Sequence, residues 1–246
     1  MDILRAEHLV RSYETPGGEK TEVLRGINLA VEKGEFAGIM GKSGCGKTTL
    51  LKVLGLIDRQ TGGELYFCGK ETGKIRGDAL ARIRLRQIGF VFQDFYLMDS
   101  LTAEENIMLP MILGREKKER MEKETYGYAE RFQITHLLKK YPYELSGGEK
   151  QRAAICRALI NNPELILADE PTGSLDSKSG QIVIDALDKI NREYGKTIVM
   201  VTHDPQMASY CSRILLLKDG AVLDELEKNK GREAFYQEIV GRMGEL

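Results

Sequence analysis

A glycine-rich run in the first third of the chain limits the possible folds more than any other feature. It reads Gly41-Lys-Ser-Gly-Cys-Gly-Lys-Thr-Thr49, where two glycines with four residues between them precede a lysine and a hydroxyl side chain. Glycines let the backbone curl so that successive N–H groups point inward at a phosphate. The apolar segment 36–40 precedes the run and a helix-forming segment follows it. The sequence therefore predicts a phosphate-binding loop between a strand and a helix.

The residue types of this loop predict separate tasks in phosphate binding. Lys47 would reach the terminal phosphates, and the Thr48 hydroxyl would complete a Mg²⁺ shell. An incidental glycine-rich turn is the alternative, but it does not account for the strand before the loop and the helix after it. The other loop positions expected to contact the nucleotide are Gly41, Ser43, Gly44, Cys45, Gly46 and Thr49.

Four short apolar runs predict a parallel sheet with one shared site. The runs are continuous rather than alternating, which is typical of strands covered on both faces. They are 36–40, 88–92, 165–168 and 197–201. Polar residues follow each run: the glycine loop, Gln93, the Asp169-Glu170 pair and His203. Since ligands bind at the carboxyl ends of parallel strands, we expect these residues to meet.

Other segments indicate an antiparallel β layer and a helical insertion. Alternating or β-branched patterns at 4–13, 22–31 and 64–68 favour antiparallel strands, punctuated by glycine-rich turns. From Asp94 to about Leu145 the pattern is helical, and a capping box at Thr102 opens one helix. We expect one domain, 1–246, with a core of 1–93 and 155–246 and a helical subdomain of 94–154.

The paired acids Asp169 and Glu170 predict metal binding and general-base catalysis. Successive side chains of an extended segment point to opposite sides, so the two carboxylates need not share one cation. Asp169 can hold magnesium, while Glu170 orients and deprotonates the attacking water. Acidic residues often follow strands, so this pair indicates a catalytic site only in combination with the glycine-rich loop.

Ser146 opens a second helix that is suited to an anion. A serine N-cap followed by Gly147 and Gly148 exposes backbone donors that the helix itself cannot satisfy. The chain has two such helix starts but only one lysine-bearing loop. We infer that the second start serves the nucleotide of another copy, an ordinary capped helix being the alternative.

In their order along nearly the whole chain, these motifs resemble those of ATP-binding cassette (ABC) ATPases. The resemblance implies an α/β P-loop NTPase fold, with a RecA-like parallel sheet core, an N-terminal antiparallel β layer and an inserted helical subdomain. It implies ATP hydrolysis with Mg²⁺ in a head-to-tail dimer, each ATP lying between the two subunits. The matching motifs are Walker A (Gly41–Thr49), the Q-loop Gln93, the signature Leu145–Glu149, Walker B (Asp169-Glu170), the D-loop Ser174–Asp176 and the switch His203.

The resemblance also implies roles for single residues. Glu170, His203, Lys47 and Gln93 would be catalytic, and Thr48, Gln93 and Asp169 would surround the metal. Tyr13 would stack on adenine, a core tyrosine being the alternative. Asp176 would contact the other subunit, a solvated turn residue being the alternative. Ser146, Gly147, Gly148 and Glu149 would contact the other subunit's nucleotide; Glu149 stands where the signature often has glutamine, with little expected loss.

Within the family, the string Asp169–Asp176 resembles the class that energises macrolide export, lipoprotein release and cell-division regulation. The strings 94–99, 175–179, 201–205 and 208–213 resemble the bacitracin-resistance (Bce-type) ATPases more narrowly. This implies a membrane permease partner and a role in clearing or sensing peptide antibiotics. Phe95 to Met98 would line a groove for a cytoplasmic helix of that permease, or else form a local minicore.

Composition and length limit the alternatives. A formal net charge of −1 leaves no basic excess for a nucleic-acid backbone or an anionic membrane surface. No apolar stretch reaches the roughly 18 to 20 residues that a membrane-spanning helix needs. The N-terminal start lacks a signal-peptide pattern, so we expect a cytoplasmic protein held at the inner membrane face by its permease. ATPases of this type that act in DNA repair or chromosome organisation carry long arms of heptad repeats between their two half-sites. The interval from Lys47 to Ser146 is too short for such arms, which excludes this class. A regulatory ATP-binding module without turnover remains an alternative.

Overall fold

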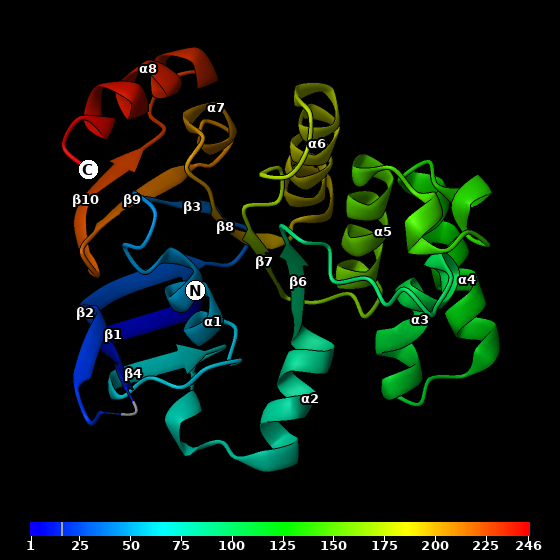
Figure 1. Ribbon diagram of the computed structural model, residues 1–246, viewed down its shortest axis with the longest axis horizontal. Coiled ribbons are helices and arrows are strands. Elements are labelled where there is room, and N and C mark those ends of the chain that lie inside the picture. The colour runs from blue at the N-terminus through cyan, green and yellow to red at the C-terminus, as the bar shows by residue number, and fades with distance from the viewer. Residues whose placement is uncertain (16) are drawn as a thin grey trace.

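The computed structural model describes residues 1–15 and 17–246, which form two sheets and a set of helices (Figure 1). The smaller, antiparallel sheet has the strand order β2-β1-β4-β5. Its strands are β1 (Asp2–Glu14), β2 (Lys20–Glu32), β4 (Gly62–Phe67) and β5 (Lys70–Glu71). The predicted antiparallel layer is therefore present.

The larger sheet has the order β10-β9-β3-β8-β7-β6. Only the β9–β10 pair in it is antiparallel. Its strands are β3 (Phe36–Met40), β6 (Ile88–Phe92), β7 (Leu165–Asp169), β8 (Thr197–Val201), β9 (Arg213–Lys218) and β10 (Ala221–Glu227). The four predicted apolar strands β3, β6, β7 and β8 are parallel neighbours, which confirms the α/β fold class.

The helical insertion lies between β6 and β7, at one edge of the larger sheet (Figure 1). Its α-helices are α3 (Ala103–Leu113), α4 (Lys118–Arg131) and α5 (Gly147–Leu159), joined by the short 3₁₀ helices η2 (Thr135–Leu137) and η3 (Pro142–Glu144). The capping box at Thr102 is formed as expected, with the Glu105 backbone N–H donating to Thr102 Oγ1 at 3.3 Å. The expected subdomain limit at 154 falls inside α5, so this helix continues from the insertion into the core.

The remaining helices surround the sheets. They are α1 (Lys47–Leu54), η1 (Thr72–Lys74), α2 (Gly77–Gln87), α6 (Ser177–Tyr194), α7 (Pro205–Ala208) and α8 (Arg232–Met243). Sequence patterns did not predict α2, α6, β9 or β10. The α2 helix contains no buried residue, so it lacks the apolar stripe that would have marked it.

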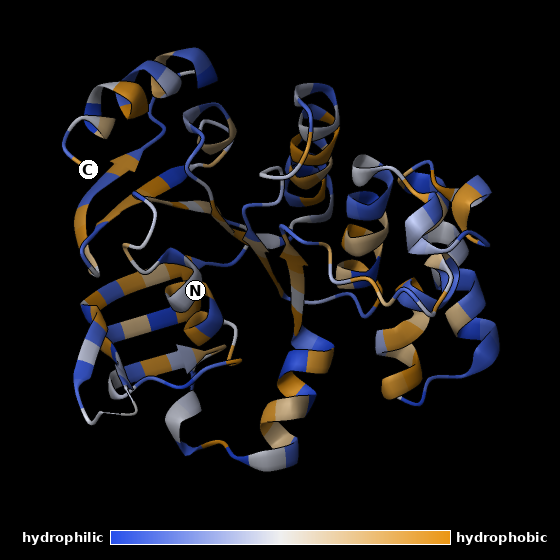
Figure 2. Ribbon diagram, in the orientation of Figure 1, coloured by the Kyte–Doolittle hydropathy of each residue, from blue (hydrophilic) through white to orange (hydrophobic). Residues whose placement is uncertain are grey.

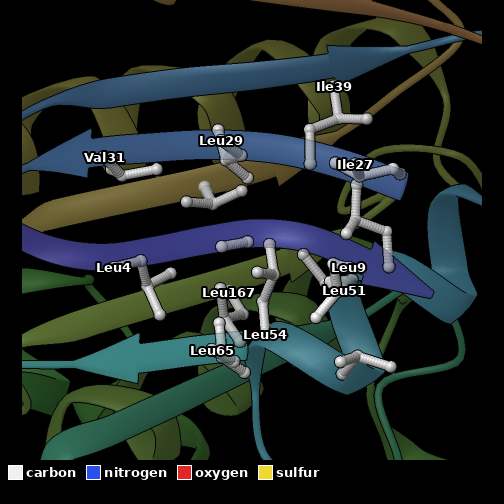
Figure 3. Packing of buried hydrophobic residues seen from close by; sticks show 14 of the residues in the cluster. Leu4, Leu9, Ile27, Leu29, Val31, Ile39, Leu51, Leu54, Leu65 and Leu167 are labelled. Carbon is white, nitrogen blue, oxygen red and sulfur yellow. The ribbon is translucent and has the colours of Figure 1, made fainter. Parts of the chain in front are cut away.

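Apolar side chains cover both faces of the larger sheet, which explains its continuous apolar strands. On one face, α1 and the antiparallel sheet pack together, as the labelled side chains Leu4, Leu29, Leu54 and Leu167 show (Figure 3). On the other face, α5, α6 and α8 contribute the second cluster. Strand β6 is strongly hydrophobic, whereas the peripheral α4 is mostly hydrophilic (Figure 2). The buried Phe235 and Ile239 pack α8 onto the domain.

Within residues 1–15 and 17–246, none of the helices combines the length and the apolar character that crossing a membrane requires.

Candidate functional site

The glycine-rich loop connects β3 to α1, as its sequence predicts. Gly46 has φ +104°, in the left-handed region that favours glycine, and α1 begins immediately after it. A Cβ atom on Gly41 would lie 2.2 Å from the Leu217 carbonyl oxygen, so only glycine fits there. Because Gly46 has no side chain, the first N–H groups of α1 remain available to an anion.

Lys47 is folded back into this loop. Its side chain is buried, and Nζ donates hydrogen bonds to the carbonyl oxygens of Gly41 at 2.7 Å and Lys42 at 2.9 Å. The ammonium is thus held at the centre of the curled backbone. A phosphate entering the loop would offer it charged oxygens in place of neutral carbonyls, which makes stronger hydrogen bonds.

Thr48 and Asp169, two of the three side chains expected around Mg²⁺, come together from α1 and β7. The Thr48 hydroxyl donates to Asp169 Oδ1 at 3.1 Å. Burial raises the pKa of Asp169, and the charge of Glu170 adds to this, while the bond from Thr48 opposes it. A bound cation would act in the opposite sense, because it favours the ionised carboxylate.

These donors suit magnesium chemically. Hydroxyl and carboxylate oxygens are the ligands that Mg²⁺ takes, and it keeps most of its other ligands as water and phosphate oxygen. Outside residue 16, the chain contains no group of three or more histidine, cysteine, aspartate or glutamate side chains arranged to hold a metal. A cation here would accordingly depend on the nucleotide for part of its shell.

Glu170 and His203 form a contact at the ends of β7 and β8. Nδ1 of His203 lies 2.9 Å from Glu170 Oε2, so that Nδ1 carries the proton of this bond. The expectation that Glu170 continues the extended strand is wrong: β7 ends at Asp169, and Glu170 has φ +46°. Its backbone N–H donates to the Val201 carbonyl at 2.9 Å, which fixes this turn.

One cavity brings together half of the predicted site residues. Its volume is about 570 Å³, and its wall comes from the loop, the strand ends and β2. The lining residues are Val23, Ser43, Gly44, Gly46, Lys47, Thr48, Thr49, Gln93, Glu170 and His203. The ends of β3, β6, β7 and β8 thus meet at this cavity, with Asp169 attached to it through Thr48.

Tyr13 lies apart from this cavity wall as far as the described residues form it. The Tyr13 hydroxyl donates to Asp58 Oδ2 at 2.7 Å, and the Arg11 guanidinium lies 4.2 Å from its ring centroid. Val23 of β2 lines the cavity instead. Sequence reasoning missed Val23, because only the packing of the two sheets against each other places it there.

A second group of predicted residues lies at the adjacent starts of α5 and α6. It consists of Ser146, Gly147, Gly148, Glu149 and Asp176. Ser146 and Glu149 make a capping box: Glu149 Oε2 accepts from the Ser146 backbone N–H at 2.7 Å. Asp176 Oδ1 accepts from the backbone N–H groups of Lys178 and Ser179, both at 3.0 Å. A Cβ on Gly148 would lie 3.0 Å from Ser179 Oγ, so glycine permits this close approach.

The sequence analysis did not identify two polar residues of α5, the buried Gln151 and the half-buried Arg157. Nε2 of Gln151 donates to the carbonyl oxygens of Pro171 at 2.6 Å and Phe92 at 3.3 Å. Arg157 donates to the carbonyl oxygens of Phe95, at 2.6 Å, and Tyr96. Both tie α5 to segments that follow the cavity strands. Nothing in the helical periodicity of α5 distinguishes them from solvated residues.

Comparisons with known proteins agree with this geometry. The family model described as "ABC transporter" matches residues 24–173. The chain is 44% identical over 247 residues to the bacitracin export ATP-binding protein BceA of Halalkalibacterium halodurans, covering 100% of this chain and 97% of that protein. It is 47% identical over 231 residues to the lipoprotein-releasing system ATP-binding protein LolD of Aquifex aeolicus, covering 92% and 99%.

A solved structure extends the likeness to three dimensions. It is the dimeric, post-hydrolysis state of the ATP-binding cassette MJ0796 bound to ADP and Pi, with a TM-score of 0.86 and 41% identity over 92% of this chain and 99% of that one. The resemblance found in the sequence is therefore confirmed. With its nucleotide-loop geometry, this chain belongs to the ABC transporter ATP-binding proteins and is an ATPase of that family.

Proposed function

We propose that this chain is the ATPase subunit of a Bce-type transporter. Two copies associate head to tail around ATP and Mg²⁺, and the cycle drives a permease that exports or senses peptide antibiotics, at the cytoplasmic face of the membrane. The contact between Glu170 and His203 at the mouth of the phosphate loop carries this proposal. The identity of 44% to a bacitracin export ATP-binding protein supports the transporter class.

In the proposed reaction, the loop N–H groups and Lys47 hold the phosphates, while Thr48, Asp169 and Gln93 face the metal. Bound Mg²⁺ supplies charge neutralisation on the terminal phosphate oxygens. Glu170 accepts a proton from the attacking water. His203 lines the cavity and holds that carboxylate through Nδ1–H, so that its other ring nitrogen can contact the terminal phosphate.

The second group of residues supplies the other half of each site in this proposal. Ser146, Gly147 and Gly148 open α5, and Asp176 opens α6. None of them lines the cavity of about 570 Å³, among the residues that the structure describes. A head-to-tail copy would bring these helix starts to the nucleotide that the first copy holds, so both subunits contribute to each site.

A second cavity, of about 340 Å³, supports permease docking. It is mainly apolar and lies between β6, α3 and α5. Tyr96, with 62% of its surface exposed, and Leu113, with 65%, both line it. Only Asp94 separates the segment Phe95–Met98 from Gln93, so a permease helix seated here would sense changes at the nucleotide.

Steady-state ATP hydrolysis by wild-type and Glu170→Gln protein tests the proposal. The amide cannot take the proton, so we expect the rate to fall by about a hundredfold or more. Nucleotide binding should persist, because Lys47 and the loop are unchanged. Glu130→Gln, which alters an exposed residue of α4, is the matched control and should hydrolyse normally. Equal rates in wild type and Glu170→Gln would refute the assigned chemistry.

A further inference from the structure

A large cavity of this molecule is separate from the nucleotide site. It has a volume of about 790 Å³ and lies among α4, α5 and α6, with the segment before β8 closing one side. It shares no lining residue with the nucleotide cavity. Its size falls within the range of small-molecule sites, roughly 300 to 1,000 Å³.

Positive charge dominates the wall of this cavity. Arg131, Arg152, Lys189 and Lys196 line it, against the single carboxylate of Asp185. That carboxylate is already engaged, because Asp185 Oδ1 accepts from Gln181 Nε2 at 2.7 Å and from the Tyr210 hydroxyl at 3.1 Å. Lys189 is also engaged, since its Nζ lies 3.8 Å from Glu193 Oε2. The wall therefore keeps a surplus of positive charge on Arg131, Arg152 and Lys196.

The two arginines are without carboxylate partners within the described part of the chain, taking 4.0 Å as the limit for an ion pair. Nε of Arg152 is buried and makes no hydrogen bond. A buried donor without a partner destabilises the fold, the more so on a charged group. An anion in the cavity would offset the uncompensated charge of this guanidinium.

Aromatic rings flank the same cations. The Arg131 guanidinium lies 5.3 Å from the ring centroid of Tyr128, on α4, and 5.4 Å from that of Tyr194, at the end of α6. Phe132 and the exposed Ile182 add apolar surface to the wall. The cavity thus offers flat, apolar surfaces beside uncompensated positive charge.

We propose that this cavity binds a small organic anion with a flat ring, the negative group on Arg152 and Arg131 and the ring against Phe132 and Tyr194. Such a ligand would contact α4, α5 and α6 together. Helix α5 begins at Ser146 and α6 at Asp176, so the anion would link the two helices that open the second group of site residues.

The chain contains no tryptophan, which permits a local optical test. Tyr194→Trp places a single tryptophan at the cavity, and 4-iodobenzenesulfonate serves as the probe, because its iodine quenches tryptophan only at contact. We expect saturable quenching, and much weaker quenching by the neutral 4-iodobenzyl alcohol. Saturating Mg-ATP should not displace the sulfonate, since the two cavities share no lining residue.

Removing the arginines completes the test. Arg131→Gln and Arg152→Gln together, in the Tyr194→Trp protein, should weaken binding by about tenfold or more, as loss of charge-assisted hydrogen bonds predicts. Lys123→Gln, which removes an exposed charge of α4 outside the cavity, should change nothing. Linear quenching equal to that of free tryptophan, displacement by ATP, or saturable quenching that survives the arginine replacements would each overturn the proposal.

A second measurement does not depend on the tryptophan. The fluorine-19 line of 4-fluorobenzenesulfonate should broaden with the unmodified chain and recover with Arg131→Gln, whose exposed side chain can be replaced without disturbing the core. Equal broadening by both proteins would count against the site even if the double arginine variant failed to fold.

Discussion

At the residue scale, Glu149 acts through hydrogen bonds to its own helix start. Its Oε2 accepts from the Ser146 backbone N–H at 2.7 Å and from the Ser146 hydroxyl at 2.9 Å. The backbone bond is the main reason that the pKa of Glu149 is lowered from its ordinary 4.5. A glutamine oxygen at this position could accept the same two bonds, though without the charge.

We therefore expect Glu149→Gln to keep ATP hydrolysis near the wild-type rate while changing how stability depends on pH. The ionised carboxylate stabilises the folded chain above pH 4.5, and this contribution is lost as the pH falls through the lowered folded-state pKa. Melting temperatures should show a wild-type advantage at pH 7 that narrows in acid. A difference in melting temperature between the two proteins that stays constant or grows in acid would contradict this interpretation of the capping box.

At the element scale, the loop after β6 connects the nucleotide site to an exposed apolar surface. Phe95 and Tyr96 both have positive φ, 62° and 46°, and Arg157 of α5 bonds to their carbonyl oxygens. Burial lowers the pKa of Arg157 to about 10, still well above neutrality, so it stays charged. The Tyr96 ring makes an edge contact with Phe92, at 5.0 Å between centroids.

Tyr96→Ala should weaken permease association while leaving ATP hydrolysis by the isolated chain intact. The side chain is mostly exposed and its backbone bond to Arg157 is retained, so the loss should be confined to the docking surface. Co-purification of the permease that accompanies the wild-type chain measures the effect. Tyr126→Ala, an exposed tyrosine of α4, is the control. Undiminished recovery of the permease with Tyr96→Ala would exclude this surface.

The elements also show what a sequence can predict. Strands β3, β6, β7 and β8 were predictable, because burial on both faces leaves continuous apolar runs. Strand β9 also has a continuous, buried apolar run, 214–217, but the sequence analysis did not identify it as a strand. The left-handed turn at Glu170 was not predictable, since its backbone N–H donates to the carbonyl of Val201, which lies on another strand. The same limit applies to Val23, which reaches the site through sheet packing.

At the scale of the whole molecule, the two groups of site residues lie apart within one copy. The loop residues face one cavity, while Ser146 and Asp176 cap helices outside its described wall. A single subunit would therefore hold an incomplete site. Two variants, each defective in a different half of the site, should therefore restore activity to one another when they are mixed.

Lys47→Ala and Ser146→Arg should each abolish hydrolysis when pure. Mixed in equal amounts, half of the dimers would be mixed, and each would contain one intact site. Activity should recover to about a quarter of the wild-type value if exchange is free, as the symmetry of a head-to-tail dimer requires. Two preparations of Lys47→Ala mixed together are the control. Mixtures that remain inactive, although both variants fold and dimerise, would rule out shared sites.

The position of the Lys47 side chain has a consequence for nucleotide exchange. Its ammonium is shielded from solvent and solvated by the carbonyls of Gly41 and Lys42. When the product leaves, these two carbonyl oxygens of the same loop take the place of its phosphate oxygens around the ammonium. The loop does not have to refold. During nucleotide exchange, carbonyl oxygens and phosphate oxygens therefore alternate around this ammonium. The loop backbone stays curled and can receive the next nucleotide.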